Sequence, residues 1–293
     1  MGFRQLVIDS SGSDPAPLEA FLEAHGALSI TLTDAGDTPL LEPAPGATPL
    51  WPDVRITALF DDTADLDAMA RSIRERASTA LSVSVEAVPD RDWERAWLED
   101  FRPQRFGERL WVCPRGQASG DPDAIELILD PGLAFGTGNH ATTALCLTWL
   151  SRRVLAGASV IDYGSGSGIL GIAALKLGAA RVAATDIDPQ ALRATRDNAA
   201  VNGVETALTA SPPAGFAPPP ADVLLANILA GTLMDLGGSL AAFVKPGGHI
   251  ALSGILADQA DEVAALYTQW FDLRRPRVRD GWALLSGRRR ART

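Results

Sequence analysis

The fold is decided by residues 160–168, which read Val-Ile-Asp-Tyr-Gly-Ser-Gly-Ser-Gly. The apolar start of this stretch predicts a buried strand, and the Ile-Leu-Gly that follows it begins a helix. Glycine has no Cβ, so the backbone between the two can take positive φ and approach a ligand closely, while the first N–H groups of the helix face that ligand. The stretch therefore predicts a turn that presents bare backbone to a small molecule.

A second strand with a carboxylate at its end follows at residues 181–186, Arg-Val-Ala-Ala-Thr-Asp. In a doubly wound sheet, an acidic residue about twenty positions after the glycine turn lies beside that turn and accepts the hydroxyl groups of a ribose. Gly166 and Asp186 together therefore predict a nucleoside site.

The identity of the nucleoside is left open by the glycine spacing alone. Gly166, Gly168 and Gly171 match the G-x-G-x-x-G pattern of dinucleotide-binding proteins, with Asp186 at a suitable distance for the ribose of NAD. An NAD-dependent oxidoreductase is therefore an alternative hypothesis.

Three features favour S-adenosylmethionine over NAD. Asp162, at the strand tip, is expected to place negative charge near a sulfonium and an amino group, whereas it would repel a pyrophosphate. The other two are the additional glycine at Gly164 and the sequence Asn-Ile-Leu-Ala at 227–230, where a later strand should end.

From residue 160 onward, strands and helices alternate, which predicts an α/β domain with a mostly parallel, Rossmann-like sheet. Ligands of such sheets bind beyond the carboxyl ends of the strands, where the strand order reverses. Gly164, Asp186 and Asn227 all follow predicted strands, so we expect them to converge on one crevice.

The first part of the chain predicts a separate small domain. Strands are expected at 3–9, 28–32, 54–60 and 81–85, and helices after Asp14-Pro15 and around 66–73. The resulting βαββαβ order is that of a ferredoxin-like α+β domain. No titratable cluster in it looks catalytic, so a docking module is expected, with a purely structural appendage as the alternative.

We accordingly divide the chain at three points. Residues 1–89 form the predicted ferredoxin-like domain, 90–126 a connector helix and linker, and 127–293 the predicted S-adenosylmethionine-binding domain. Trp93, Trp97 and Phe101 recur every four residues and predict one face of the connector helix.

A glycine-rich loop at 130–143 precedes the turn and runs into a helix opened by threonines. Its glycines and hydroxyls can close over a ligand. Thr142 can cap the helix, touch the ligand, or do both. For His140, a structural hydrogen bond is favoured over a role as general base.

Composition excludes several classes of protein. With 46% hydrophobic and 21% charged residues, the chain is a globular protein rather than a disordered one. A net charge of -10 argues against direct nucleic-acid binding and suits a basic protein partner. Cys113 and Cys146 match no metal or redox spacing, the three histidines are scattered, and no apolar run is long enough to span a membrane. A metal-free cytoplasmic protein, acting as a monomer, is expected.

Four stretches together resemble the ribosomal protein L11 methyltransferase (PrmA) family of class I methyltransferases: residues 130–143, 162–168, 186–189 and 227–231. The resemblance extends over essentially the whole chain. It implies a seven-stranded methyltransferase sheet and a first domain that grips the basic substrate. It also implies transfer of methyl groups from S-adenosylmethionine to lysine side-chain amines and the N-terminal amine of ribosomal protein L11. The positions expected to hold the cofactor are Thr143, Gly164, Gly166, Asp186 and Asn227.

Methyl transfer from sulfonium to nitrogen is an in-line displacement, so the site must mainly align the reactants and exclude water. The amine must be neutral, and removal of a lysine from water lowers its pKa toward that form. We expect the side-chain oxygen of Asn227 to accept a hydrogen bond from the amine and direct its lone pair. A different protein or a small amine as acceptor, or an adaptor with a vestigial nucleoside site, are the remaining alternatives.

Overall fold

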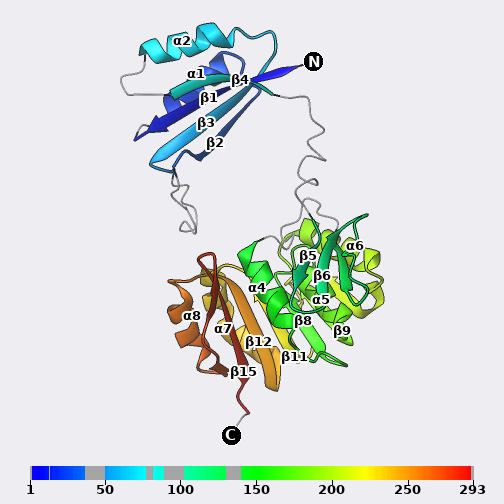
Figure 1. Cartoon of the computed structure of the whole chain (residues 1–293). Helices are drawn as coiled ribbons and strands as arrows, with labels where there is room; N and C mark the ends of the chain where they lie inside the picture. Colours follow the sequence, from blue (N-terminus) through cyan, green and yellow to red (C-terminus); the bar gives the residue numbers. More distant parts are fainter. Residues whose placement is uncertain are drawn as a thin grey trace. The chain divides into compact units, whose positions relative to one another are not determined.

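The computed structural model describes residues 2–12, 14–36, 50–76, 82–88, 102–129 and 140–291. The chain divides into two compact units, Met1–Ala96 and Trp97–Thr293. Figure 1 draws the first in blue to cyan and the second mainly in green to red. Each unit is considered by itself.

The first unit has the predicted βαββαβ order. Its four strands form an antiparallel sheet with the spatial order β2-β3-β1-β4, which confirms the ferredoxin-like topology. The elements are β1 (Phe3–Ser11), α1 (Ala16–Ala24), β2 (Ser29–Asp34), β3 (Asp53–Asp61), α2 (Leu66–Arg76) and β4 (Ser82–Val88).

Strict alternation in the central strands decides which face of this sheet is covered. In β3, Val54, Ile56 and Phe60 are the large buried residues of an alternation that also buries Ala58, and the residues at the intervening odd-numbered positions are more exposed. Successive side chains of a strand point to opposite faces, so these three share one face. They pack with Leu22 of α1 and Ile73 of α2, which places both helices on that face.

The second unit contains a mostly parallel sheet with the order β10-β9-β8-β11-β12-β15-β13. Only β15 runs antiparallel, to both β12 and β13, and the short β14 pairs with β15 outside this path. The predicted seven-stranded sheet is therefore confirmed, with one extra strand. The strands are β8 (Ser159–Tyr163), β9 (Arg181–Thr185), β10 (Leu208–Ser211), β11 (Ala221–Asn227), β12 (Val244–Leu256), β13 (Phe271–Leu273), β14 (Arg277–Arg279) and β15 (Trp282–Arg289).

Helices cover both faces of this sheet, because its central strands are apolar on both sides. Val160 of β8 and Leu225 of β11 pack against the first three helices, whereas Ile161 and Leu224, their chain neighbours, pack against the last two. The five helices are α4 (Ala141–Leu150), α5 (Ile169–Lys176), α6 (Pro189–Val201), α7 (Ala230–Ala242) and α8 (Ala260–Tyr267).

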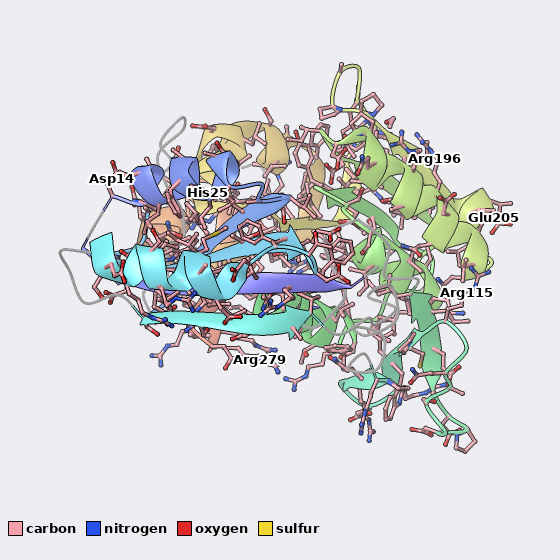
Figure 2. All side chains as sticks on the ribbon, turned by 90° about the horizontal axis from the view of Figure 1, so that it is seen from above. Asp14, His25, Arg115, Arg196, Glu205 and Arg279 are labelled. Atoms are coloured by element: carbon pink, nitrogen blue, oxygen red, sulfur yellow. The ribbon has the colours of Figure 1, made fainter. Side chains whose placement is uncertain are left out.

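Helix α6 is tied to the edge of the sheet by a long side chain. Arg196, labelled in Figure 2, donates from Nη2 to the carbonyl oxygen of Ala210 in β10 at 2.7 Å. The short 3-10 helix η1 (Glu205–Ala207) lies between α6 and β10. Over the described part of the chain, every helix falls short of the length and apolar character needed to cross a membrane.

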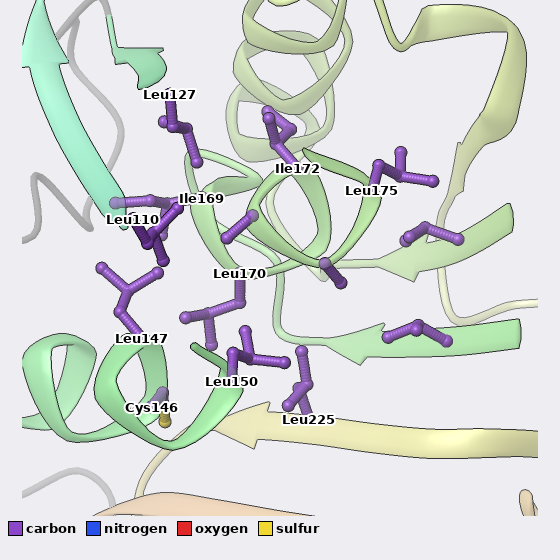
Figure 3. Packing of buried hydrophobic residues seen from close by; sticks show 14 of the residues in the cluster. Leu110, Leu127, Cys146, Leu147, Leu150, Ile169, Leu170, Ile172, Leu175 and Leu225 are labelled. Carbon is purple, nitrogen blue, oxygen red and sulfur yellow. The ribbon is translucent and has the colours of Figure 1, made fainter. Parts of the chain in front are cut away.

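The expectation of a linker up to residue 126 is wrong for the part of that segment described from residue 102. There the chain forms β5 (Gln104–Phe106) and β6 (Leu110–Pro114), which join β7 (Ile125–Leu129) in a three-stranded sheet. Leu110 is fully buried against Leu127 and Ile169 in the core beside α4 and α5, as Figure 3 shows. The predicted helix through Trp93, Trp97 and Phe101 lies outside the described residues.

One side chain attaches this small sheet to the main domain. Asn202, at the end of α6, accepts from the backbone N–H of Ile128 at 2.8 Å and donates to its carbonyl oxygen at 2.7 Å. The side-chain amide thus makes the two hydrogen bonds to Ile128 that a neighbouring strand would otherwise make. The attachment holds β7 against the same domain that carries the glycine turn.

Candidate functional site

The predicted glycine turn follows β8 and has the backbone geometry that requires glycine. Gly164, Gly166 and Gly168 have φ angles of 77°, 54° and 79°. The backbone N–H groups of Gly164 and Ser165 both donate to the carbonyl oxygen of Thr185, at 2.8 and 3.0 Å. The turn is therefore fastened to the end of the neighbouring strand β9.

Gly164 also permits a close approach from β11. A Cβ atom built at this position would overlap the Cγ2 methyl group of Ile228. On the other side, Gly254 of β12 meets the backbone carbonyl of the same Ile228. The segment that follows Asn227 is thus held between two glycines, and a side chain at either one would displace it.

The structure brings Asp186 to the turn, as the sequence predicted. Its Oδ2 accepts from the N–H of Gly166 at 2.8 Å, and its Oδ1 accepts from the N–H of Asp188 at 3.0 Å. Each carboxylate oxygen has a second lone pair. Asp186 is half-buried, so both oxygens can accept one further hydrogen bond from a ligand.

Asn227, at the tip of β11, is oriented by Thr143 near the start of α4. The amide Nδ2 donates to the Thr143 hydroxyl at 3.3 Å. Thr143 is only 1% exposed and its hydroxyl orients the amide, while its contact with the cofactor stays a prediction. Within the described residues the Oδ1 of Asn227 accepts no hydrogen bond, which leaves it available as an acceptor.

Asp162 does not present its charge to a ligand, contrary to the expectation from the sequence. It is 1% exposed, and its Oδ2 accepts from the N–H of Gly171 in α5 at 2.8 Å. Its Oδ1 has no partner in the part of the chain that the structure describes. Burial raises the pKa of this carboxyl to about 7, and Asp186 adds to the rise while the Gly171 hydrogen bond opposes it. Asp162 therefore stabilises the first turn of α5 from within the core.

His140 has the structural role that the sequence favoured. Its Nδ1 accepts from the backbone N–H of Thr142 at 3.4 Å and lies 2.8 Å from the Thr142 hydroxyl, so it caps α4. The ring also makes an edge contact with Trp282, with centroids 4.9 Å apart. The preceding loop residues 130–139 lie outside the described residues.

Sequence reasoning missed two side chains of α6 that hold the glycine turn. Thr195 donates from Oγ1 to the carbonyl oxygen of Gly166 at 3.0 Å, and Asn198 donates from Nδ2 to that of Ser167 at 2.9 Å. Both are buried polar residues on one helical face, three positions apart. Such polar residues on the inward face of an amphipathic helix are the signal that could have identified them.

Ile187 was also missed. It follows Asp186 directly and is 88% exposed, although it is a large apolar residue. An apolar side chain beside a carboxylate that is predicted to bind a ribose is suited to contact the flat face of a base. The signal was an isoleucine between two aspartates in a surface turn.

The predicted site residues therefore form two joined pairs at the carboxyl ends of the parallel strands. Gly166 contacts Asp186, Thr143 contacts Asn227, and Gly164 lies against the residue after Asn227. The strand order reverses between β8 and β11, where the turn and Asn227 lie. In the described part of the chain, no group of three or more His, Cys, Asp or Glu residues is placed to hold a metal ion.

Comparison with known proteins agrees with this geometry. The family model described as "Ribosomal protein L11 methyltransferase (PrmA)" matches residues 2–290. The chain belongs to the ribosomal protein L11 methyltransferase family. This assignment sets aside the NAD-dependent oxidoreductase suggested by the glycine spacing.

Individual relatives support the family over the full length. The chain is similar to the ribosomal protein L11 methyltransferases of Pseudomonas aeruginosa (53% identical over 93% of each chain) and Hahella chejuensis (47% over 99% of each). Among solved structures, it is similar to a ribosomal protein L11 methylase from Lactobacillus delbrueckii subsp. bulgaricus. That match has 33% identity and a TM-score of 0.59, and it covers 65% of this chain and all of the other.

Gly164→Ala should weaken cofactor binding, because the new Cβ must displace Ile228 as well as adopt an unfavourable φ. Gly203→Ala is the matched control: its φ is 66°, and a Cβ there meets nothing within 4 Å. We expect both variants to lose about 1 kcal/mol of unfolding free energy from backbone strain. Only Gly164→Ala should also lose affinity for S-adenosylmethionine, measured by calorimetry. Equal affinities in the two variants would contradict the proposed close approach.

Asp162→Asn should change how stability depends on pH. A carboxyl whose pKa is raised from 3.8 to about 7 on folding is held in its neutral form, so it lowers stability progressively as pH rises from about 4 to 7. Asparagine keeps an oxygen for the Gly171 N–H but cannot ionise. The variant should therefore gain stability relative to the parent as the pH rises from about 4 to 7, by about 1.4 kcal/mol for each unit of pKa shift crossed. Urea unfolding at both pH values measures this, and a pH-independent difference would refute it.

Proposed function

We propose that this protein transfers methyl groups from S-adenosylmethionine to amines of ribosomal protein L11. The observation that carries the proposal is the junction of the Gly166–Asp186 and Thr143–Asn227 pairs at one edge of the sheet, in a chain of this family. Lysine side chains and the N-terminal amine are the proposed acceptors. We expect the enzyme to act as a monomer in the cytoplasm.

The residues present fit S-adenosylmethionine. Asp186 retains one lone pair on each oxygen for the two ribose hydroxyls, and the exposed side chain of Ile187 offers an apolar surface to the adenine. Gly164 and Gly166 have no side chains, so the turn leaves room for the rest of the nucleoside. Bound there, the cofactor supplies a methyl group on a positively charged sulfur.

Asn227 is the proposed positioning group for the acceptor amine. Because its Nδ2 is engaged by Thr143, its Oδ1 can accept a hydrogen bond from an amine N–H and direct the nitrogen lone pair toward the methyl group. Ile228, the residue after Asn227, packs on the turn at Gly164, so we expect Asn227 to contact the cofactor as well. A lysine that leaves water for this site loses its proton more readily, which supplies the neutral nucleophile.

The first unit carries the charge needed to hold a basic substrate. Residues 1–96 contain 17 acidic and seven basic residues, a net charge of -10, whereas residues 97–293 contain 19 of each. The whole net charge of the protein thus belongs to the small unit. We assign substrate recognition to residues 1–89 and cofactor binding to residues 127–293, because an acidic domain attracts and orients a basic ribosomal protein.

The proposal predicts methylation of purified ribosomal protein L11 when it is incubated with this protein and isotopically labelled S-adenosylmethionine. Mass spectrometry should find methyl groups on lysine side chains and on the N-terminal amine. Other basic ribosomal proteins in the same reaction serve as controls and should remain unmodified. Label on those proteins but not on L11 would refute the substrate assignment, and no label on any protein would refute the activity.

Asn227→Ala should lower kcat about 10- to 100-fold, since one hydrogen bond to a group that develops charge is worth about 1.5–3 kcal/mol. Thr143→Val, which removes only the hydroxyl that orients the amide, should lower kcat by less. The affinity for S-adenosylmethionine, measured separately, should change less than kcat in both variants. Wild-type kcat in a folded Asn227→Ala protein would refute this role.

A further inference from the structure

A groove rimmed by arginines lies on the second unit, away from the glycine turn. It is a concavity of about 650 Å³ between helix α4 and strand β14. Arg152, just after α4, and Arg277, Val278 and Arg279 of β14 form its exposed rim, and Leu145 and Thr148 contribute to its floor. We refer to these six residues as the arginine groove. Figure 2 labels Arg279, which is exposed.

Local geometry explains why the groove has an apolar floor and a charged rim. Arg152 lies just beyond the end of α4, four residues after Thr148, and both residues line the groove. Strand β14 is held across from them by pairing with β15, with Arg277 opposite Leu284 and Arg279 opposite Trp282. Val278 lies between the two arginines in the strand and is 58% exposed.

Further positive charge surrounds the rim. The guanidinium of Arg153 lies 4.2 Å from the ring centroid of Trp149, and its pKa is lowered by burial and by the neighbouring Arg274 and Arg277. Burial and then the charge of Arg153 likewise lower the pKa of His249. The charged groups that shift the pKa of Arg153 are thus all cations.

Few carboxylates balance these charges. In the described residues, Arg279 has one acidic partner, the exposed Asp280 at 3.3 Å, and Arg152, Arg274 and Arg277 form no ion pair. Between residues 274 and 290 the sequence has seven arginines and one aspartate. Like charges held together raise the free energy of the free protein and create a positive potential that attracts an anion.

We propose that the arginine groove binds the phosphate backbone of single-stranded RNA. Guanidinium groups pair bidentately with phosphate oxygens, and the second unit uses 17 arginines but only two lysines for its positive charge. Unpaired bases pack on apolar surface and on guanidinium planes, which the floor and the three rim arginines provide. An acidic protein segment would satisfy the rim but would leave the exposed Val278 without a comparable flat partner.

The position of the groove connects RNA binding with the candidate site. Near its start, helix α4 contacts Asn227 with the side chain of Thr143. Further along the same helix, Leu145 and Thr148 line the groove. At the other side, Trp282 contacts His140 and pairs in register with Arg279. RNA in the groove therefore lies alongside the helix that orients Asn227. This inference does not depend on which protein is methylated.

The expectation that the protein does not bind nucleic acid came from its net charge of -10. That charge belongs to the first unit, whereas the second unit is neutral overall and concentrates its arginines in one place. Phosphate binding depends on the local density of cations, so the net charge of the whole chain does not exclude it.

The test measures binding of the full chain to a short fluorescent single-stranded RNA by anisotropy over a range of salt concentrations. The groove variant is Arg152→Gln/Arg277→Gln/Arg279→Gln, and the control, Arg71→Gln/Arg181→Gln/Arg193→Gln, removes the same charge at exposed sites elsewhere. Only the groove variant should bind about tenfold more weakly, and its slope of log affinity against log salt should be smaller by about 2, since each phosphate contact contributes about 0.7 on a single strand.

A second variant separates charge from folding. Replacing the same three arginines by lysine keeps the positive charge, so the salt dependence should stay close to that of the parent, and thermal unfolding should be unchanged in every variant. The proposal is overturned if the parent does not bind RNA or if the control loses as much affinity as the groove variant. It is also overturned if poly-glutamate displaces RNA at equal charge concentration, because the groove would then serve an acidic protein.

Discussion

The hydrogen bond from the N–H of Gly166 to the carboxylate of Asp186 is the constraint on which the candidate site depends. It joins the turn after β8 to the end of β9, and it fixes one oxygen of the residue proposed to hold the ribose. A turn with side chains in place of its glycines could not adopt the positive φ angles that aim this N–H. This hydrogen bond therefore holds the glycine-rich turn in one conformation.

Buried polar groups behind the turn keep that surface in place. Thr195 and Asn198 satisfy carbonyl groups of the turn, while Asp162 satisfies an N–H group of the helix that follows it. Polar groups removed from water are costly unless they are paired, so this network favours one conformation of the turn. Asp162 is the exception, because its second oxygen has no partner among the described residues, and its pKa is raised accordingly.

Charge is distributed unevenly between the two units. The first unit holds all the net negative charge, and the second gathers arginines between α4 and β14 while it remains neutral overall. A basic protein and a polyanion would thus be attracted to different parts of one chain.

Sequence pattern predicted the elements that have strong periodicity. The alternation in β3 and the glycine run after β8 identified the two architectures, and the positions of Gly166 and Asp186 predicted a nucleoside site whose two residues the structure brings into contact. Residues 104–114 were mistaken for a linker because their strands are short and are stabilised by contacts with Leu127 and Ile169, which are distant in the chain. Local periodicity carries no information about such contacts.

The sequence by itself determined which residues can serve a site: the glycines that allow close approach, the carboxylate at a strand end and the amide of Asn227. Only the tertiary structure decided what each one contacts. It turned Asp162 inward, set Thr143 behind Asn227, and brought Arg152 and Arg277 together from segments more than a hundred residues apart in the sequence. The reason is that residue type fixes the chemistry of a side chain, whereas its direction, burial and charged neighbours arise from packing between elements that are remote along the chain.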